Sequence, residues 1–166
     1  MAEVCHGAPW PRAAFVLDLD RIGTPLLADL EELERRPTVV VGAVAGECEG
    51  PALAAALAVD LLVAGPRATF RSPGEWSGLV IRRGVGVAGR KVMAYLTMTG
   101  RTIDAELACL WGIVSRVSDD PLATAVALAD EVAARSPRAV ATILRQAHAG
   151  AAADYARTPF TGRVSR

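Results

Sequence analysis

An uninterrupted apolar run, Val39–Val44, most limits how this chain can fold. Its six residues are four valines, one alanine and one glycine. A continuous run of this length, rich in β-branched side chains, is typical of a strand that is covered on both faces. Such strands occur mainly in parallel sheets flanked by helices, so the run indicates an α/β chain.

Strand-like and helix-like segments alternate along the rest of the sequence. Further short strands are expected over Phe15–Leu19, Leu61–Ala64 and Ile113–Val117. Helices are expected over 24–35, 51–58, 87–98, 104–111, 121–135 and 137–149, several of them with Pro at the first position or Gly after the last. A polar turn at 46–50 and a loop-rich stretch at 71–86 complete the pattern. This alternation predicts one α/β domain over residues 1–166, with 1–14 and 151–166 as loose tails.

Composition excludes several classes of protein. The 166 residues are 52% hydrophobic and 22% charged, which is typical of a folded chain. Eighteen basic side chains balance 18 acidic ones, so no charge excess favours nucleic acid or an anionic membrane. Cys5, Cys48 and Cys109 are far apart and lack paired histidines, so we expect no disulfide framework, metal or cofactor. Without a signal-peptide pattern or an apolar run of about 18 residues, the chain is expected to be cytoplasmic and free of membrane spans.

Three stretches have a recognisable spacing of residues. RPTVVVGAVAG joins a basic residue and a proline to the apolar run and ends in Ala45-Gly46. The next two place these residues in register: Asp60, Ala64, Ala68, Phe70 and Pro73, then Thr99-Gly100, Ala105, Ala108, Trp111-Gly112 and Val114. Over roughly residues 37–145 the sequence resembles the crotonase (enoyl-CoA hydratase/isomerase) superfamily. The resemblance implies a crotonase-like ββα spiral, shortened at the N-terminus, with C-terminal oligomerisation helices.

The resemblance also implies a site whose usual chemical groups this chain lacks. Crotonases stabilise a thioester enolate with two backbone N–H groups, which is oxyanion-hole chemistry. One donor position falls on Pro51, which has no N–H, so Gly50 is the neighbouring candidate donor. The two hydratase carboxylates fall on Ala54 and Gly74, neither of which can transfer a proton. Ordinary hydration of an enoyl thioester is therefore not expected.

The second enolate donor comes, in this family, from a Phe-x-Ala-Gly-x-Asp-Leu segment. FVLDLDRI is the only candidate here: Phe15 and Asp20 match, whereas Leu17 and Asp18 replace Ala-Gly. Asp20 is accordingly a candidate substrate-binding residue, and the alternative is a cap before the helix expected at residue 25.

Glu75 is the first candidate to replace the missing carboxylates. It directly follows the vacant position at Gly74, and a shift of one residue would carry its carboxylate into the site. Trp76 beside it would wall an apolar pocket and raise the pKa of the acid by desolvation. The alternative is a solvated loop acid beside an ordinary, partly buried tryptophan.

Glu47 and Glu49 form the second candidate pair. If the turn around them is extended, both side chains point to one side and could act as an acid and a base with different pKa values. The alternative is that they stabilise the N-terminus of the helix expected at Pro51. Between them, Cys48 is expected to be a small buried cysteine rather than a nucleophile.

Arg71, Arg82 and Arg83 are candidates to bind a carboxylate or phosphate group of a substrate. Solvated surface arginines are the alternative.

Two functions follow from these residues and the resemblance. The first is a crotonase-like enzyme of a specialised (secondary-metabolite) biosynthetic pathway, performing a lyase, isomerase or cyclase step on a CoA or carrier-protein thioester or on an acid without a thioester. The alternative is a non-catalytic crotonase-like partner that stimulates another biosynthetic enzyme. The resemblance also implies a homo-oligomer, a trimer or hexamer, and the apolar side of Pro121–Ala149 is expected to be buried in it.

Overall fold

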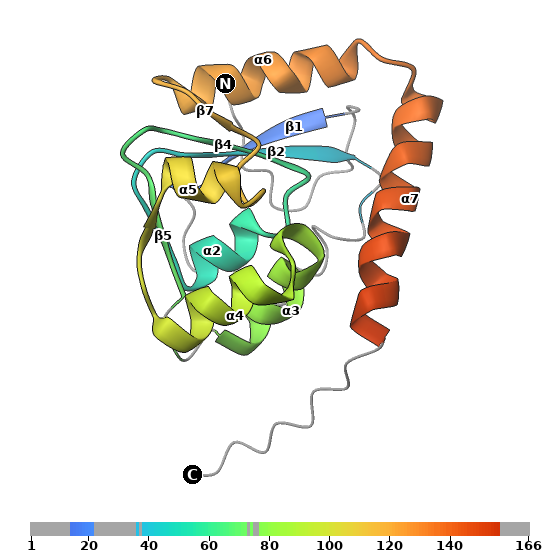
Figure 1. Ribbon diagram of the computed structural model, residues 1–166. Coiled ribbons are helices and arrows are strands. Elements are labelled where there is room, and N and C mark those ends of the chain that lie inside the picture. Colours follow the sequence, from blue (N-terminus) through green and yellow to red (C-terminus); the bar gives the residue numbers. More distant parts are fainter. Residues whose placement is uncertain (1–13, 22–35, 37, 73, 75–76, 157–166) are drawn as a thin grey trace.

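The computed structural model describes residues 14–21, 36, 38–72, 74 and 77–156. Its larger sheet is fully parallel and has the strand order β1-β2-β4-β7. These strands are β1 (Ala14–Asp18), β2 (Val39–Val44), β4 (Leu61–Ala64) and β7 (Arg116–Val117). The apolar run of the sequence is thus a central strand, as its composition predicted (Figure 1).

The chain continues from the strands of the larger sheet into a second, smaller sheet. It consists of β3 (Glu47–Glu49), β5 (Thr69–Arg71) and β6 (Ile103–Asp104) in the order β3-β5-β6. The β3–β5 pair is parallel and the β5–β6 pair is antiparallel. Because β2 leads directly into β3, and β4 into β5, each turn of the chain contributes a strand to both sheets. This repetition, followed by a helix, is the predicted ββα spiral.

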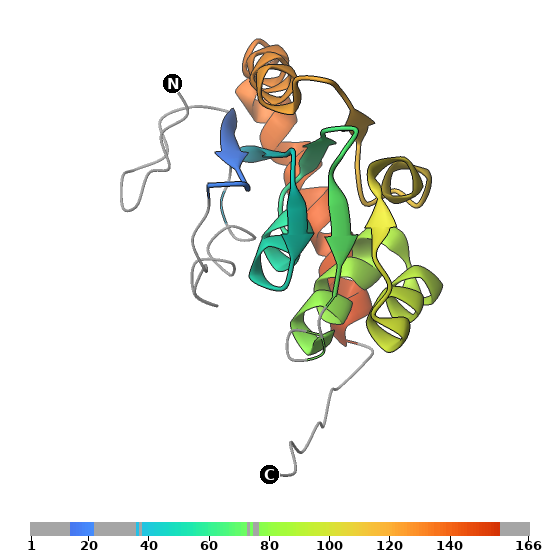
Figure 2. The same cartoon turned by 90° about the vertical axis from the view of Figure 1, so that its left-hand side faces the viewer.

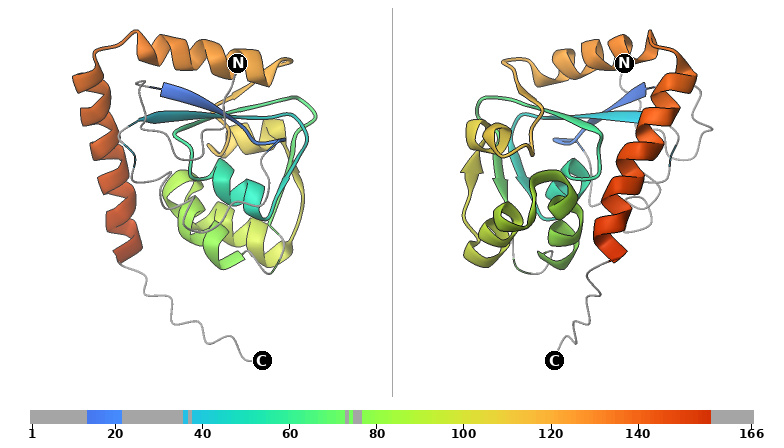
Figure 3. Two further views of the ribbon diagram at one scale, coloured as in Figure 1. Left: turned by 180° about the vertical axis from the view of Figure 1, so that it is seen from behind. Right: turned by 45° about the vertical axis from the view of Figure 1, so that its right-hand side comes forward.

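Six helices of the described part of the chain surround the sheets. They are α2 (Pro51–Ala56), α3 (Ser77–Ala88), α4 (Arg90–Thr99), α5 (Ala105–Leu110), α6 (Pro121–Ala133) and α7 (Pro137–Ala156). Figure 2 shows α6 at one end of the molecule and α3 with α4 at the other. Helix α6 covers β1 and β2, while α7 runs down one side and contacts α3 (Figure 3).

Local chemistry explains several helix boundaries. Asp104 and Asp120 act as N-caps, each accepting a hydrogen bond from a first-turn amide, at 2.8 Å from Leu107 and 3.0 Å from Ala123. Gly100 caps the C-terminus of α4. Its φ of 61° is left-handed, a conformation that glycine adopts readily because it has no Cβ.

The alternating side chains of β2 enter two separate cores. Val40 and Val44 pack with α2–α5 and the smaller sheet, whereas Val39 and Val41 pack under α6 and α7. All four are at least nine-tenths buried. Burial of each such side chain stabilises the fold by about 1.5–3 kcal/mol, which explains why both faces of this strand are apolar.

Other expectations about the elements are corrected by the structure. The predicted turn at 46–50 contains strand β3, and most of the predicted loop at 71–86 is helix α3. The helix expected over 87–98 is the end of α3 and most of α4, separated at Gly89, where φ is 84°. Of the strand expected at 113–117, only Arg116–Val117 is paired as a strand. Helix α7 continues beyond its expected end at residue 149, to Ala156. The helix expected over 24–35 lies outside the described residues.

The short strand at the predicted turn has a physical explanation. β3 and β5 are three residues long and are held by pairing with each other across the fold, a non-local contact that no short window of sequence shows. Among the described residues, no helix is both long and apolar enough to cross a membrane.

Candidate functional site

The candidate site is the junction where β3 ends and α2 begins. Gly50 has φ 55° and ψ −120°, and Pro51 is the first residue of α2. The Gly50 carbonyl accepts a hydrogen bond from the Ala54 amide at 3.0 Å, and no side chain caps this end of the helix. Ala54, the predicted first hydratase position, is fully buried in the core and carries only a methyl group against neighbouring side chains.

Glu47 and Glu49 point to the same side of β3, as alternation predicted. Both are exposed while Cys48 between them is buried. Arg71 on β5 donates its Nε–H to Glu49 Oε2 at 2.9 Å. Together with Thr69 and Thr102, these side chains line a surface hollow of about 240 Å³. The two acids are therefore brought together with Arg71, but in an open hollow rather than a closed pocket.

Cys48 faces the opposite, buried side of the strand. Burial raises the pKa of its thiol from 9.0 to about 12, and the charge of Asp20 adds to the effect. The thiol is a poor nucleophile at neutral pH because the reactive form is the thiolate. The expectation of a small buried cysteine is confirmed.

Asp20 lies just beyond β1 and binds backbone rather than presenting a free carboxylate. Its two oxygens accept hydrogen bonds from the amides of Ala45, at 2.7 Å, and Gly46, at 3.0 Å. A Cβ at Gly46 would lie 3.3 Å from Asp20 Oδ1, so the glycine permits this close approach. Asp20 thus ties the end of β1 to the junction between β2 and β3.

The remaining candidates are dispersed. Arg82 is exposed on α3, whereas its neighbour Arg83 is only 2% exposed and is not a solvated surface arginine. Glu75 and Trp76 lie outside the described residues. Within the described part of the chain, no group of three or more His, Cys, Asp or Glu side chains is placed to hold a metal ion.

A second hollow lies at the carboxyl ends of β2, β4 and β7. It has a volume of about 270 Å³ and is lined by Ala45, Gly65, Pro66, Arg67, Asp119 and Pro121. This edge of a parallel sheet is a common place for ligands in α/β folds. Its charged groups, Arg67 and Asp119, were not singled out from the sequence because they lie on separate loops.

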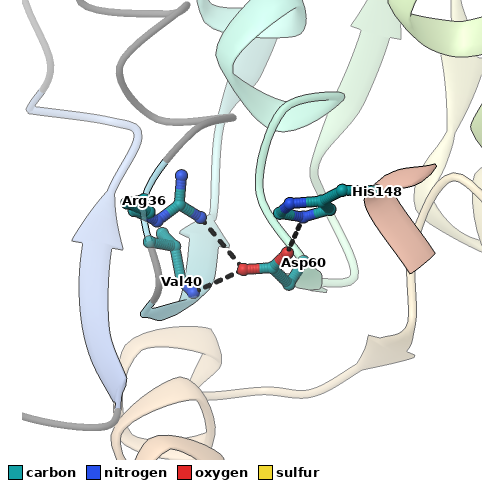
Figure 4. Close-up of polar contacts among 4 residues, drawn as sticks. All are labelled: Arg36, Val40, Asp60 and His148. Carbon is teal, nitrogen blue, oxygen red and sulfur yellow. Dashed lines mark hydrogen bonds and ion pairs between the residues drawn. The ribbon is translucent and has the colours of Figure 1, made fainter. Parts of the chain in front are cut away.

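A buried network centred on Asp60 was also missed by the sequence interpretation. Asp60 Oδ2 accepts hydrogen bonds from the Val40 amide at 2.7 Å and from the Arg36 guanidinium at 3.0 Å (Figure 4). Asp60 Oδ1 lies 2.9 Å from His148 Nε2 on α7. The Arg36 guanidinium also lies over the Phe15 ring, 5.6 Å from its centroid. The network links segments next to β2 and β4 with β1 and α7. Arg36 is buried and Asp60 is 14% exposed, so we interpret the network as structural.

Comparison with known proteins shows which family this chain resembles in sequence. A family model described as enoyl-CoA hydratase/isomerase matches residues 19–163. An enoyl-CoA-hydratase of Amycolatopsis orientalis is 30% identical over 109 residues, covering 63% of this chain and 50% of the relative. A carnitinyl-CoA dehydratase of Proteus mirabilis is 32% identical over 123 residues, covering 70% of this chain and 47% of the relative. The chain spans about half the length of the curated relatives it matches.

Solved structures share the fold over most of the chain. A monofunctional enoyl CoA isomerase from M. smegmatis superposes with a TM-score of 0.70 at 26% identity, covering 79% of this chain and 67% of that one. ThnE from S. clavuligerus gives a TM-score of 0.68 at 20% identity, covering 88% of this chain and 82% of that one. The second likeness concerns the fold alone, and it extends over most of both chains.

Proposed function

This chain belongs to the enoyl-CoA hydratase/isomerase family, and from that premise we propose that it is an enzyme that transfers a proton on an acyl thioester without hydrating it. The observation that carries the proposal is the junction of β3 and α2. Pro51 begins α2 and has no N–H to donate. The family spacing predicts a donor amide at this residue and the two carboxylates at Ala54 and Gly74. Addition of water needs one group to activate the water and one to protonate the α-carbon.

A proton-transfer step requires fewer groups than hydration. One base removes the α-proton, and hydrogen-bond donors stabilise the enolate oxygen that forms. Lyase, isomerase and cyclase reactions can all begin in this way. We assign the chain such a step in a specialised biosynthetic pathway, on a CoA or carrier-protein thioester. Relatives named for enoyl, mevalonyl and carnitinyl CoA compounds support a scaffold that accepts varied acyl groups.

Glu75 is the proposed base, because it is adjacent in sequence to the vacant position at Gly74. Glu47 and Glu49 are the weaker candidates. They face an open hollow where water competes for every hydrogen bond, and Arg71 already binds Glu49.

Exchange of α-protons in D₂O tests this proposal. Wild-type protein is expected to exchange the α-protons of butyryl-CoA, or of its pantetheine thioester as a carrier mimic, faster than buffer alone. Glu75→Gln should slow exchange by about 10²–10⁴, since it keeps the shape and removes the ionisable group. Glu106→Gln, at an exposed acid of α5, is the matched control and should exchange like wild type. Unchanged exchange in Glu75→Gln would transfer the role to Glu47 and Glu49.

A non-catalytic partner is the second candidate function. The open hollow around Glu47 and Glu49 favours it, because a surface of this kind is accessible to another protein. Wild-type protein that exchanges neither thioester, yet raises the rate of a biosynthetic enzyme encoded beside it, would establish this function instead.

We also propose that the chain forms a trimer or hexamer. Leu122 and Val126 on α6 are 38% and 39% exposed, and Ile143 on α7 is 65% exposed. A second copy packed on these helices would remove this apolar surface from water. Light scattering should give three or six times the chain mass of 17.3 kDa, and a monomer at micromolar concentration would contradict the proposal.

A further inference from the structure

Ser72 has a buried hydroxyl group that the fold itself does not use. Its side chain is 1% exposed, and Oγ has no hydrogen-bond partner in the described part of the structure. Buried hydroxyl groups nearly always have a partner, since desolvation without a hydrogen bond destabilises the folded protein. An unsatisfied group of this kind is therefore a candidate for contact with a ligand.

The strand register places Ser72 beside the start of α2. β3 and β5 are parallel, and Glu49 lies opposite Arg71, so the next residues along the two strands are Gly50 and Ser72. Arg71 is exposed, whereas Ser72 is buried, in accordance with the alternation of a strand. Ser72 directly follows β5, and by alternation its side chain lies on the buried side with Phe70. Cys48 and the α2 residue Leu53 belong to the same core cluster as Phe70.

This is the place where the site lacks a donor. Pro51 has no N–H to offer to a thioester oxygen. Two other hydroxyl groups, those of Thr69 and Thr102, line the outer hollow with Glu47 and Glu49 instead. Ser72 lies on the buried side.

We propose that Ser72 is a catalytic residue whose Oγ–H donates a hydrogen bond to the carbonyl oxygen of a bound acyl thioester, in place of the amide missing at Pro51. The inference rests on the proposed function, because it requires a thioester at this junction. When the α-proton leaves to a base, its electron pair moves into the carbonyl and negative charge develops on oxygen. Ser72 keeps its own proton, and its hydrogen bond strengthens as that charge grows. The Gly50 amide is the neighbouring donor.

The ligand-free protein provides the first test. Ser72→Ala removes an unsatisfied polar atom, so its Tm is expected to equal or exceed that of wild type. Ser115→Ala is the matched contrast: the Ser115 hydroxyl accepts a hydrogen bond from the Leu62 amide at 3.1 Å, and its loss should lower Tm. A Tm of Ser72→Ala lowered as much as that of Ser115→Ala would show that the Ser72 hydroxyl supports the fold, and would overturn the assignment.

Binding of two probes provides the second test. Acetoacetyl-CoA forms an enolate that absorbs in the near ultraviolet, its proton passing to buffer, while butyl-CoA is a thioether with no carbonyl oxygen. Ser72→Ala should weaken acetoacetyl-CoA binding about 10- to 100-fold, as expected for one hydrogen bond to a charged oxygen, and should reduce the enolate band. Its Kd for butyl-CoA should match that of wild type.

Three outcomes distinguish the role of Ser72 from the presence of a thioester site. Equal acetoacetyl-CoA binding by wild type and Ser72→Ala overturns the role of Ser72 and leaves the thioester site intact. Failure of wild type to bind either probe overturns the thioester site, and the role of Ser72 with it. If Ser72→Ala does not fold, Ser72→Cys replaces it, since a thiol is a weaker donor of similar size, and an enolate band as strong as that of wild type would then contradict the proposal.

Discussion

Two arginine–carboxylate pairs in this molecule have nearly the same length and opposite surroundings. Arg36 and Asp60 are 3.0 Å apart, with side chains 1% and 14% exposed. Arg71 and Glu49 are 2.9 Å apart, with side chains 48% and 45% exposed. The first pair joins the segments that precede β2 and β4, and the second lies at the candidate site. Burial, rather than distance, therefore separates a pair that the fold requires from one that a ligand can reach or displace.

The same contrast extends to the regions around the two pairs. Around Asp60, a backbone amide, a guanidinium and an imidazole converge on one carboxylate. Motif spacing predicts that the family's proton-transfer positions fall on Ala54 and Gly74, and neither residue can ionise. The scaffold and its chemistry are thus separable, and a family fold does not by itself establish the family reaction.

The largest expected effect concerns hydration. We expect no measurable hydration of crotonyl-CoA, because a lost oxyanion donor lowers a rate about 10²–10³-fold and absent acid–base groups lower it about 10²–10⁴-fold. Hydration removes the carbon–carbon double bond that is conjugated with the thioester, and the resulting loss of ultraviolet absorbance measures the reaction. A turnover number above about 1 s⁻¹, an ordinary value for an enzyme, would mean that Pro51, Ala54 and Gly74 are not the residues at these positions.

The buried pair should give the next largest effect. Asp60→Ala is expected to lower the free energy of unfolding by about 3–5 kcal/mol, because it removes the Asp60 carboxylate from the buried Arg36 guanidinium and from the Val40 amide. Urea unfolding followed by circular dichroism measures the change.

Asp130→Ala, at an exposed acid on α6, is the control for this substitution and should change stability by less than about 0.5 kcal/mol. A similar small loss in Asp60→Ala would remove the basis for calling this network structural, and with it the contrast between the two pairs.

Much of the scaffold was predictable because its signals are local. β2 was recognised from its own residues, and the caps at Asp104 and Gly100 lie where their helices were expected to begin and end. His148 could not be paired with Asp60 from the sequence, since the two are 88 residues apart and meet only after α7 folds back. The helix α3 was missed because its glycines suggested a loop, whereas Gly84 is a point of close packing against Met93.

The site was predictable only in part. Alternation correctly placed Glu47 and Glu49 on one side of their segment. The assignment of Ala54 and Gly74 to the carboxylate positions, made from motif spacing, stays a prediction. Whether that side is open or closed depends on the packing of β5 and β6, which come from distant parts of the chain. Ser72 gave no signal in the sequence, because its significance comes from burial and from the register of β3 and β5.

Alkaline pH should distinguish the buried side of β3 from its exposed side. Burial raises the pKa of Cys48 from 9.0 to about 12, so above pH 9 the unfolded chain releases this proton and the folded chain retains it. The associated stability is complete below pH 9 and is lost progressively as pH rises toward 12, by about 1 kcal/mol at pH 10. Unfolding of wild type and Cys48→Ala between pH 8 and 10 measures the difference in slope.

Cys109→Ala, at a half-buried thiol, is the comparison for this experiment. If Cys48→Ala retained the full alkaline loss of wild type, the Cys48 thiol would have to be less buried than the structure shows.

The smallest effect is expected at the exposed pair of Arg71 and Glu49, whose coupling can be compared directly with that of the buried pair. A double-mutant cycle with Glu49→Gln and Arg71→Gln should give a coupling free energy of about 0.2–1 kcal/mol, because water screens both charges and their side chains lose freedom on pairing. The coupling should decrease further in 1 M NaCl, where the Debye length is about 3 Å. A value near that of the buried pair, or one that salt leaves unchanged, would mean that the hollow is closed in solution. The two glutamates would then share a desolvated pocket, and they would replace Glu75 as the leading candidates for proton transfer.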